Sequence, residues 1–310
     1  MRKKKILITW HYLLPLSPKY KKLLRKNDIS YDVKSVNPCL NEHQLAKIIT
    51  KYDGIICGDD QINKRVIDTA KKLKVISKWG TGLNSIDVDY AIKKGIKVYN
   101  SPKAFVESVT VYVLGLLINL SRGLFKIHTS IMNNKWEKYS GIELTNKKLG
   151  IIGFGNIGAN IANVASAFGL NILINDTNKK LKSIALKRGY SFVSKEKLLK
   201  NSDFLIIATD LNESSFHLLS FKDFKIIKKD LILINISRGP VIHEEALIKN
   251  IKKIGGIGLD VFENEPLAKN HIFKKFHNAV LGSHNAFNTK EAVQRTNDDC
   301  IFNLIKGLTK

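Results

Sequence analysis

Cysteine is scarce in this chain. Its three cysteines, Cys39, Cys57 and Cys300, are far apart among 310 residues and form no C-x-x-C pair. An odd and sparse set does not build a disulfide framework, and disulfides persist mainly in oxidising compartments. The sequence therefore predicts reduced thiols and a cytoplasmic location.

Arginine is scarce as well. Only seven of the 51 basic residues are arginine, although the formal net charge is +24. A phosphate-binding face built for nucleic acid uses clustered residues and forked guanidinium groups. Here the lysines are spread over the whole chain, so we predict no specific nucleic-acid partner and only non-specific association with polyanions at low salt.

Long hydrophobic runs are absent. The most apolar run, residues 109–120, is too short to span a bilayer and predicts a buried helix. The basic start followed by ILITW resembles a signal peptide, but His11, Pro15 and Pro18 interrupt it and no small-residue cleavage site follows. We therefore expect no membrane partner.

Short β-prone runs alternate with helical patterns through residues 1–100. Strands are expected at residues 5–10, 31–36, 54–57, 74–77 and 96–99, with helices at 20–26, 42–50, 63–73 and 88–94. This alternation predicts a parallel sheet with helices on both faces. No glycine fingerprint occurs in this part.

A second region of the same kind begins at Pro102, which breaks the pattern. Apolar residues from Phe105 to Leu120 follow at helical spacing, and strands are expected at residues 149–152, 170–174, 204–208, 231–236 and 256–259. A closing helix is expected from a cap at Asn288, with Glu291 three residues on, to about residue 308. The fold class is therefore α/β, with two doubly wound, Rossmann-like parallel sheets.

The most informative stretch is KLGIIGFGNIGANIANVASAFGLNILIND, residues 148–176. It contains G-x-G-x-x-G between a strand and an amphipathic helix, whose inner face we expect at Ile157, Ile161, Val164, Ala165 and Phe168. The glycines would permit a tight turn, backbone approach to a pyrophosphate and close helix packing. Asp176 ends the second strand, where a carboxylate can bind a ribose diol and repel a 2′-phosphate. The hexapeptide alone is also found in ordinary packing turns, but its context favours a dinucleotide site.

Polar residues follow four other predicted strands, where doubly wound sheets bind ligands. They are Lys78 with Gly80-Thr81-Gly82, Ser237-Arg238-Gly239, the acids Asp260, Glu263 and Glu265, and His284. Each has an ordinary interpretation: a turn, a salt bridge, a solvated acid or a structural histidine. Neither His243-Glu244-Glu245 nor His271 and His277 have the spacing of a metal site, so no metal is predicted.

Together these motifs resemble a known family. They are KWGTGLNSID (78–87), ELTNKKLGIIGFGNIG (143–158), INISRG (234–239), GLDVFENEP (258–266) and SHNAFNTKEA (283–292). The chain is similar, over nearly its whole length, to the D-isomer-specific 2-hydroxyacid dehydrogenases, and most closely to short forms of their D-3-phosphoglycerate dehydrogenase branch, which lack a regulatory domain. The resemblance implies a substrate-binding domain from residues 1–101 and 286–310, with an NAD-binding Rossmann domain, residues 102–285, inserted between them. It also implies a homodimer, for which helix 105–120 is the candidate interface.

Three catalytic residues are implied by the resemblance. Arg238 would hold the carboxylate of a 2-oxo acid and polarise its carbonyl, which a forked guanidinium does better than lysine. His284 would be the acid/base, and Glu265 would stabilise its imidazolium form.

The implied binding residues form two sets. NAD would be bound by Gly153, Gly155, Asn156, Ile157, Gly158, Asp176, Thr209, Ser237 and Asp260. The substrate would be bound by Lys78, Gly80, Thr81 and Gly82, with Arg238 and His284. Lys179 and Lys180 follow Asp176 and could partly offset its preference for NAD over NADP.

The chain departs from the family pattern at several positions. Asp210-Leu211-Asn212 replaces P-L-T near the adenine, and Ser283 replaces a proline before His284. Cys57-Gly58-Asp59-Asp60 and Lys78 stand where phosphate-binding arginines are usual. The clamp for a substrate phosphate is therefore weakened.

Three hypotheses for function result. The first is an NAD-dependent oxidoreductase of a small D-2-hydroxy acid, with 3-phosphoglycerate as one substrate and glyoxylate or hydroxypyruvate as the alternative. The second is an NAD(H)-sensing protein without catalysis, which an intact Arg238, Glu265 and His284 set disfavours. The third is an oxidoreductase of phosphite or formate, which Glu265 disfavours because the formate branch typically has glutamine there.

Overall fold

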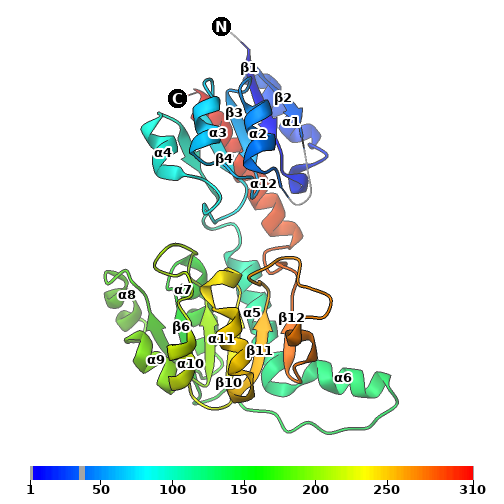
Figure 1. Cartoon of the computed structure of the whole chain (residues 1–310), viewed down its shortest axis with the longest axis vertical. Coiled ribbons are helices and arrows are strands. Elements are labelled where there is room, and N and C mark those ends of the chain that lie inside the picture. The colour runs from blue at the N-terminus through cyan, green and yellow to red at the C-terminus, as the bar shows by residue number, and fades with distance from the viewer. Residues whose placement is uncertain (1–2, 35–38, 310) are drawn as a thin grey trace. The chain divides into compact units, whose positions relative to one another are not determined.

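The computed structural model describes residues 3–34 and 39–309 and divides into two compact units (Figure 1). Unit 1 lies within residues 1–105 and 289–310, and unit 2 is residues 106–288. The limits drawn from the sequence, after residue 101 and before residue 286, lie a few residues from these. Both units are α/β with parallel sheets, as predicted.

Unit 1 contains a five-stranded parallel sheet in the order β2-β1-β3-β4-β5. Its strands are β1 (Lys4–Ile8), β2 (Ile29–Val33), β3 (Gly54–Cys57), β4 (Val75–Lys78) and β5 (Lys97–Tyr99). Its helices are η1 (His11–Leu13), α1 (Pro18–Lys26), α2 (Glu42–Ile49), α3 (Lys64–Thr69), α4 (Val88–Lys93) and α12 (Lys290–Thr309). Of the strand expected at residues 31–36, the last two residues lie outside the described part of the chain.

Three helices of unit 1, α2, α3 and α4, start at side-chain caps. Asn41 caps α2 in a reciprocal pair with Gln44, and Asn63 and Asp87 accept from backbone N–H groups at the starts of α3 and α4. Helix α3, expected to reach residue 73, ends at Thr69. There the Thr69 hydroxyl bonds the carbonyl of Val66 and the backbone leaves the helical region.

The core of unit 1 lies on both faces of its sheet. On one face, Leu7, Ile55 and Ile76 of the strands are fully buried and belong to one cluster with residues of α2 and α3. On the other face, α12 packs on β3 and β4, where the Ser77 hydroxyl donates to the carbonyl of Cys300 at 2.9 Å. The helix α12, from the C-terminal part of the chain, therefore covers one face of the sheet formed by its N-terminal part.

Unit 2 contains a seven-stranded parallel sheet in the order β12-β11-β10-β9-β6-β7-β8. Its strands are β6 (Lys148–Ile152), β7 (Asn171–Asn175), β8 (Ser191–Phe192), β9 (Phe204–Ile207), β10 (Leu231–Asn235), β11 (Ile254–Leu259) and β12 (Ala279–Leu281). Its helices are α5 (Val106–Arg122), α6 (Leu124–Met132), α7 (Asn156–Ser166), α8 (Leu181–Lys187), α9 (Lys195–Asn201), α10 (Phe221–Ile226) and α11 (Glu244–Lys249), with short 3-10 turns η2 (Gly239–Val241), η3 (Ile251–Lys253) and η4 (Ile272–Lys275). The sequence did not predict β8 or α6.

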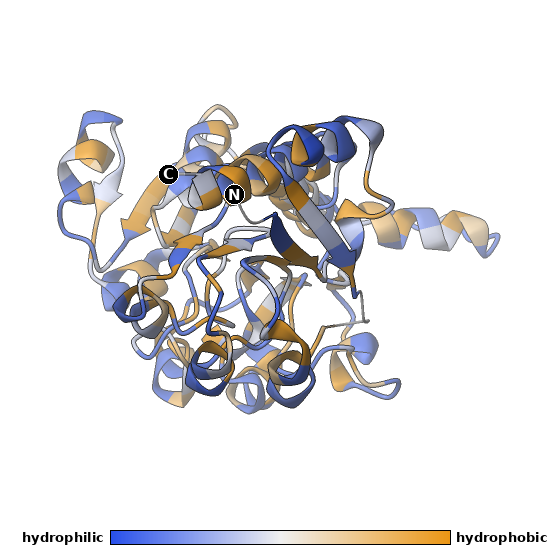
Figure 2. Ribbon diagram, turned by 90° about the horizontal axis from the view of Figure 1, so that it is seen from above, coloured by the Kyte–Doolittle hydropathy of each residue, from blue (hydrophilic) through white to orange (hydrophobic). Residues whose placement is uncertain are grey.

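Hydropathy follows this layering. The strands are mostly hydrophobic, whereas the helices alternate hydrophobic and hydrophilic residues (Figure 2). Continuous apolar strands are typical of parallel sheets buried on both faces. In unit 2, for example, Leu233 and Ile234 are neighbours in β10 and both have no exposed surface.

The predicted buried helix is confirmed as α5. Val113 and Leu117 are fully buried, and the helix packs on β10, β11 and β12. Among the described residues, no single helix is both long and apolar enough to cross a membrane. Helices α5 and α6 meet that criterion only as a pair, with a bend of 66° between them.

Two details predicted at helix ends were wrong. Helix α7 ends at Ser166, so Phe168, expected on its inner face, is 42% exposed. Helix α12 is capped by Thr289, whose hydroxyl accepts from the backbone N–H of Ala292. Asn288 does not cap it, because its amide donates to the Asn285 side chain.

Candidate functional site

The glycine turn joins β6 to α7. Gly153 has φ +94°, and a Cβ there would lie 2.6 Å from the carbonyl oxygen of Ala208 and 2.8 Å from the backbone nitrogen of Thr209. A Cβ on Gly158 would collide with the carbonyl oxygen of Gly153. Two of the three glycines are thus required by the protein itself.

Gly155 differs from the other two glycines. A Cβ on it would meet no protein atom within 4 Å. The residue stands at the N-cap of α7, an eleven-residue helix beginning at Asn156 and Ile157. Open space before the first amides of a helix fits a pyrophosphate, which the helix N-terminus attracts.

Asp176 closes the turn from the end of β7. One carboxylate oxygen accepts from the Phe154 N–H at 2.6 Å, and the other accepts from the Asn178 N–H at 2.7 Å. Lys179 donates to the Asp176 carbonyl at 3.4 Å, not to the carboxylate. The carboxylate is therefore fixed beside the glycine turn, where a ribose diol can reach its remaining lone pairs.

Arg238 follows β10 in a loop that Asn235 holds. The buried Asn235 side chain accepts from the backbone and hydroxyl of Ser237 at 3.0 and 2.9 Å, and donates to the carbonyl of Arg238 at 3.0 Å. The guanidinium is half-buried and spends one donor on the Ser237 carbonyl, at 2.8 Å. A guanidinium has five N–H donors, so it can still bind a carboxylate.

His284 and Glu265 form a hydrogen-bonded pair. The imidazole Nδ1 lies 2.9 Å from one Glu265 oxygen, and the other oxygen accepts from the Phe262 N–H at 3.0 Å. Burial by itself would raise the pKa of Glu265, but the bond and charge of His284, the Phe262 N–H and the charge of Arg238 hold that pKa below its usual range. Glu265 is thus kept as a carboxylate facing the imidazole.

Asp260 anchors the loop that carries His284. It is 1% exposed, and its backbone carbonyl accepts from the His284 N–H at 2.7 Å. Its two carboxylate oxygens accept from the backbone of Asn285 and Ala286 at 3.0 and 2.8 Å. The carboxylate expected beside the cofactor is therefore occupied in holding this loop.

In unit 1, the residues proposed to bind substrate lie at the carboxyl end of β4, and they contact residues that follow β3 and β5. The amide of Asn100 donates to the Thr81 carbonyl at 2.6 Å, and the Ser101 N–H donates to the Gly80 carbonyl at 2.9 Å. The Lys78 ammonium is buried and bonds Asp59 at 3.1 Å and the Trp79 carbonyl at 3.0 Å. Its charge is therefore neutralised within unit 1.

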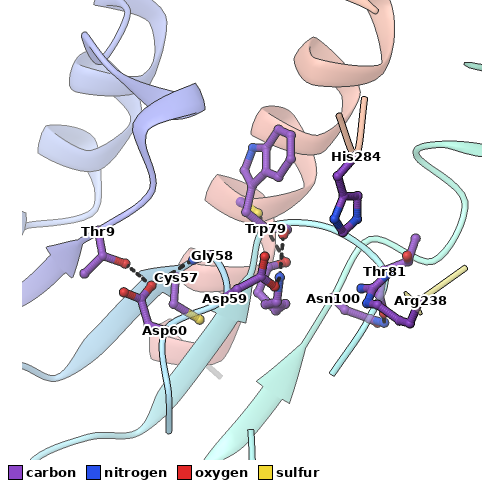
Figure 3. A network of polar contacts seen from close by, with 12 residues as sticks. Thr9, Cys57, Gly58, Asp59, Asp60, Trp79, Thr81, Asn100, Arg238 and His284 are labelled. Carbon is purple, nitrogen blue, oxygen red and sulfur yellow. Dashed lines mark hydrogen bonds and ion pairs between the residues drawn. The ribbon is translucent and has the colours of Figure 1, made fainter. Parts of the chain in front are cut away.

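Asp60 forms a second buried network beside Lys78. One oxygen accepts from the Thr9 hydroxyl at 2.6 Å and the Gly58 N–H at 3.0 Å (Figure 3). The other accepts from the Leu40 N–H at 2.8 Å. Sequence reasoning did not find this network, nor the role of Asn235. Both depend on contacts between residues that no local pattern connects.

The chain is similar to known proteins in sequence. The family model for the NAD-binding domain of D-isomer-specific 2-hydroxyacid dehydrogenases matches residues 114–286. A glyoxylate reductase of Thermofilum pendens is 35% identical over 277 residues, 86% of this chain and 82% of the relative. A hydroxypyruvate reductase of Thermotoga maritima is also 35% identical, over 87% of this chain and 89% of the relative.

The chain is also similar to solved structures. A D-lactate dehydrogenase from Aquifex aeolicus, complexed with NAD and lactic acid, superposes with a TM-score of 0.82 at 26% identity, covering 96% of this chain and 93% of that one. The glycine turn, open at Gly155 and closed by Asp176, fits NAD as the cofactor. This chain therefore belongs to the D-isomer-specific 2-hydroxyacid dehydrogenase family, the NAD-dependent oxidoreductases of small 2-hydroxy and 2-oxo acids.

Proposed function

We propose that the protein reduces a small unphosphorylated 2-oxo acid of the glyoxylate or hydroxypyruvate class with NADH, and oxidises the D-2-hydroxy acid in reverse. The observation that carries this proposal is the pair formed by His284 and Glu265, with Nδ1 and the carboxylate 2.9 Å apart. Because Glu265 engages Nδ1, proton transfer to the substrate oxygen falls to Nε2. NAD, when bound, supplies or accepts the hydride at C2.

Arg238 is proposed to bind the substrate carboxylate and polarise the neighbouring carbonyl. Its backbone is fixed by Asn235, and its charge also contributes to keeping the Glu265 pKa low. A forked guanidinium can bind both carboxylate oxygens, which an ammonium cannot copy. The substrate is thereby oriented with its carbonyl oxygen toward the acid/base.

The cofactor residues are proposed from the glycine turn outward. Gly153, Gly155, Asn156, Ile157 and Gly158 would hold the pyrophosphate, Asp176 the adenosine ribose, and Thr209 and Ser237 the rest of the cofactor-facing edge. The Asp260 carboxylate, expected from the sequence to be a cofactor residue, is proposed instead to hold the His284 loop. NAD is preferred over NADP because a fixed carboxylate at residue 176 repels a 2′-phosphate. In domain terms, residues 102–285 bind NAD, and residues 1–101 with 286–310 bind substrate.

The substrate end of unit 1 supports an unphosphorylated acid. Residues 57–60 carry two carboxylates and no arginine, and the Lys78 charge is paired with Asp59. A phosphate there would compete with the Asp59 carboxylate, which is 53% exposed, for the buried ammonium of Lys78. We therefore favour glyoxylate or hydroxypyruvate, which the names of two relatives mention, over 3-phosphoglycerate.

A homodimer is proposed through α6 and the segment that follows it. Helix α5, the interface expected from the sequence, buries its apolar side within unit 2. By contrast α6 projects from unit 2 (Figure 1) and leaves hydrophobic side chains exposed: Leu124 at 47%, Phe125 at 61%, Ile131 at 45%, Met132 at 68% and Trp136 at 87%. Several exposed apolar side chains within one short segment are typical of an interface between subunits.

The dimer is tested by size-exclusion chromatography with light scattering. Trp136→Asp is expected to convert the dimer to a monomer, whereas Trp136→Phe should remain a dimer. A monomeric wild-type protein would contradict the proposed dimer.

The three cysteines are all free thiols in the structure. This supports a proposed location in the reducing cytoplasm.

The proposed activity is tested with NADH oxidation across a panel of glyoxylate, hydroxypyruvate, pyruvate and 3-phosphohydroxypyruvate. We expect kcat/KM for one of the first two to exceed that for the phosphorylated acid by at least about tenfold, since residues 57–60 supply no cation and the Lys78 charge is already paired with Asp59. His284→Ala should lower kcat by about 10²- to 10⁴-fold, as loss of a general acid does.

Arg238→Ala should abolish most turnover while NADH still binds. Arg188→Ala, at an exposed position, should keep its turnover. Tight NADH binding without turnover of any acid would favour a sensor and reject the proposal.

A further inference from the structure

One face of α5 runs along β11 and reaches the loop of His284. Tyr112, Leu116 and Leu120 are four residues apart and therefore share a face of the helix. Leu116 and Leu120 lie against Gly258, where a Cβ would be 3.3 and 3.1 Å from their methyl carbons. Four residues of a helix and two residues of a strand advance about the same distance. Tyr112, four residues before Leu116, therefore lies opposite Asp260, two residues after Gly258.

The Tyr112 hydroxyl meets the Asp260 carboxylate. Both groups lie beside Gly282, because a Cβ built on that residue would overlap with the Tyr112 hydroxyl and with the Asp260 carboxylate. Burial first, and then the charge and hydrogen bond of Asp260, raise the pKa of Tyr112 far above its usual range, so the phenol remains a donor. The Tyr112 hydroxyl thus lies beside a carboxylate that already accepts from the backbone of Asn285 and Ala286.

The loop that Asp260 holds is under backbone strain. His284 has φ +56°, in the left-handed region that a residue with a Cβ adopts only at a cost. The bonds from Asp260 to residues 284–286 stabilise this conformation and direct the His284 side chain to Glu265. Any movement of the Asp260 carboxylate would therefore be transmitted to the imidazole.

We propose that Tyr112 is a positioning residue for the reaction: its hydroxyl fixes the Asp260 carboxylate, and through it the strained loop that presents His284. The inference rests on the proposed function, because it assigns the effect to proton transfer by His284. Tyr112 itself touches neither the substrate nor the transferred proton in this assignment. Its effect is expected on kcat and not on the binding of NADH.

The test compares Tyr112→Phe with Tyr52→Phe in the full-length protein. Tyr52 in unit 1 also donates to an aspartate, Asp32, at 2.7 Å. Tyr52→Phe therefore removes the same chemical group as Tyr112→Phe, but at a position away from the candidate site. Tyr112→Phe should lower kcat for 2-oxo acid reduction by about tenfold, as misplacement of a reacting group does, with the NADH dissociation constant unchanged. The solvent isotope effect on kcat should rise, because proton transfer becomes slower. Tyr52→Phe should change none of these quantities.

A double-mutant cycle separates positioning from general destabilisation. In a His284→Ala background, Tyr112→Phe should lower kcat by less than about twofold, because the residue through which it acts is gone. Unchanged kcat and isotope effect in Tyr112→Phe, or an equal loss in the His284→Ala background, would overturn the inference. Failure of the wild-type protein to reduce any 2-oxo acid would instead overturn the proposed function, so the two failures are distinguishable.

Discussion

The side-chain amide of Asn235 donates to the backbone carbonyl of Arg238, and its oxygen accepts from Ser237. A single buried amide thus shapes the loop that presents the guanidinium. Asn235→Ala should raise the KM for the 2-oxo acid more than it lowers kcat, reducing kcat/KM by about ten- to a hundredfold. The reason is that a displaced Arg238 guanidinium no longer orients the substrate correctly.

The matched control for this change is Asn278→Ala. Asn278 is similarly buried and donates to the Gly255 carbonyl at 2.7 Å, but at the start of β11, away from the strand ends that carry the site. It should lose comparable stability with little effect on kinetics. Steady-state kinetics and thermal unfolding of the two variants measure these effects. Equal changes in kcat and KM in both variants would refute the role of Asn235.

Gly155 and Gly158 are expected to behave differently when changed to alanine. A Cβ at residue 155 has no protein neighbour within 4 Å, whereas one at residue 158 collides with the Gly153 carbonyl. Gly155→Ala should fold with unchanged Tm but bind NADH at least about tenfold more weakly, because the methyl group occupies cofactor space. Gly158→Ala should lose about 1–3 kcal/mol of stability through overpacking. Calorimetry and NADH titration measure both, and tight NADH binding by Gly155→Ala would be inconsistent with the assigned site.

Glu265→Gln should lower kcat by about a hundredfold, because a neutral amide does not stabilise the imidazolium. Its effect on stability depends on pH. The Glu265 pKa is depressed in the folded protein, so the stabilisation from this carboxylate is present above its unfolded-state pKa and is lost as pH falls through the folded-state value.

This dependence is measured by denaturant unfolding from pH 7 to pH 3. The difference in unfolding free energy between wild type and Glu265→Gln should shrink as pH falls below the usual glutamate pKa of about 4.3. Glu196→Gln, at an exposed pair with Lys200, serves as the kinetic control and should keep its kcat. A stability difference that grows toward acid would contradict the charge state assigned to Glu265.

Asp176→Asn should weaken the preference for NADH over NADPH by at least about tenfold, because it removes the repulsion of a 2′-phosphate. One amide oxygen can still accept from the Phe154 or Asn178 N–H, so the turn should persist. The ratio of kcat/KM for the two cofactors is the measurement. An unchanged ratio would show that other residues set the preference.

The sequence predicted those parts of the protein whose signals are local. The glycine turn, the alternation of strands and helices, and the polar residues that follow several strands all lie in short stretches, so residues 148–176 could be interpreted directly. The pairing of His284 with Glu265 came from family resemblance, and the structure places the two side chains in contact. Their catalytic roles remain predictions.

What the sequence missed depends on tertiary contact. Nothing near Asn235 or Tyr112 in the chain indicates that the one holds Arg238 and the other meets Asp260. Likewise the apolar residues of α6, such as Phe125 and Met132, have a helical spacing that would normally predict burial, yet they are exposed. Burial, unlike periodicity, is decided by what packs against a helix.

The contact between α5 and β11 also links the stability of unit 2 to the geometry of the site. A Cβ on Gly258 would lie 3.1–3.3 Å from methyl groups of Leu116, Leu120 and Ile234, so a larger residue in the strand would require these side chains to move. The two segments are more than a hundred residues apart in sequence. A substitution that shifts α5 along the strand would therefore also move Tyr112 relative to Asp260.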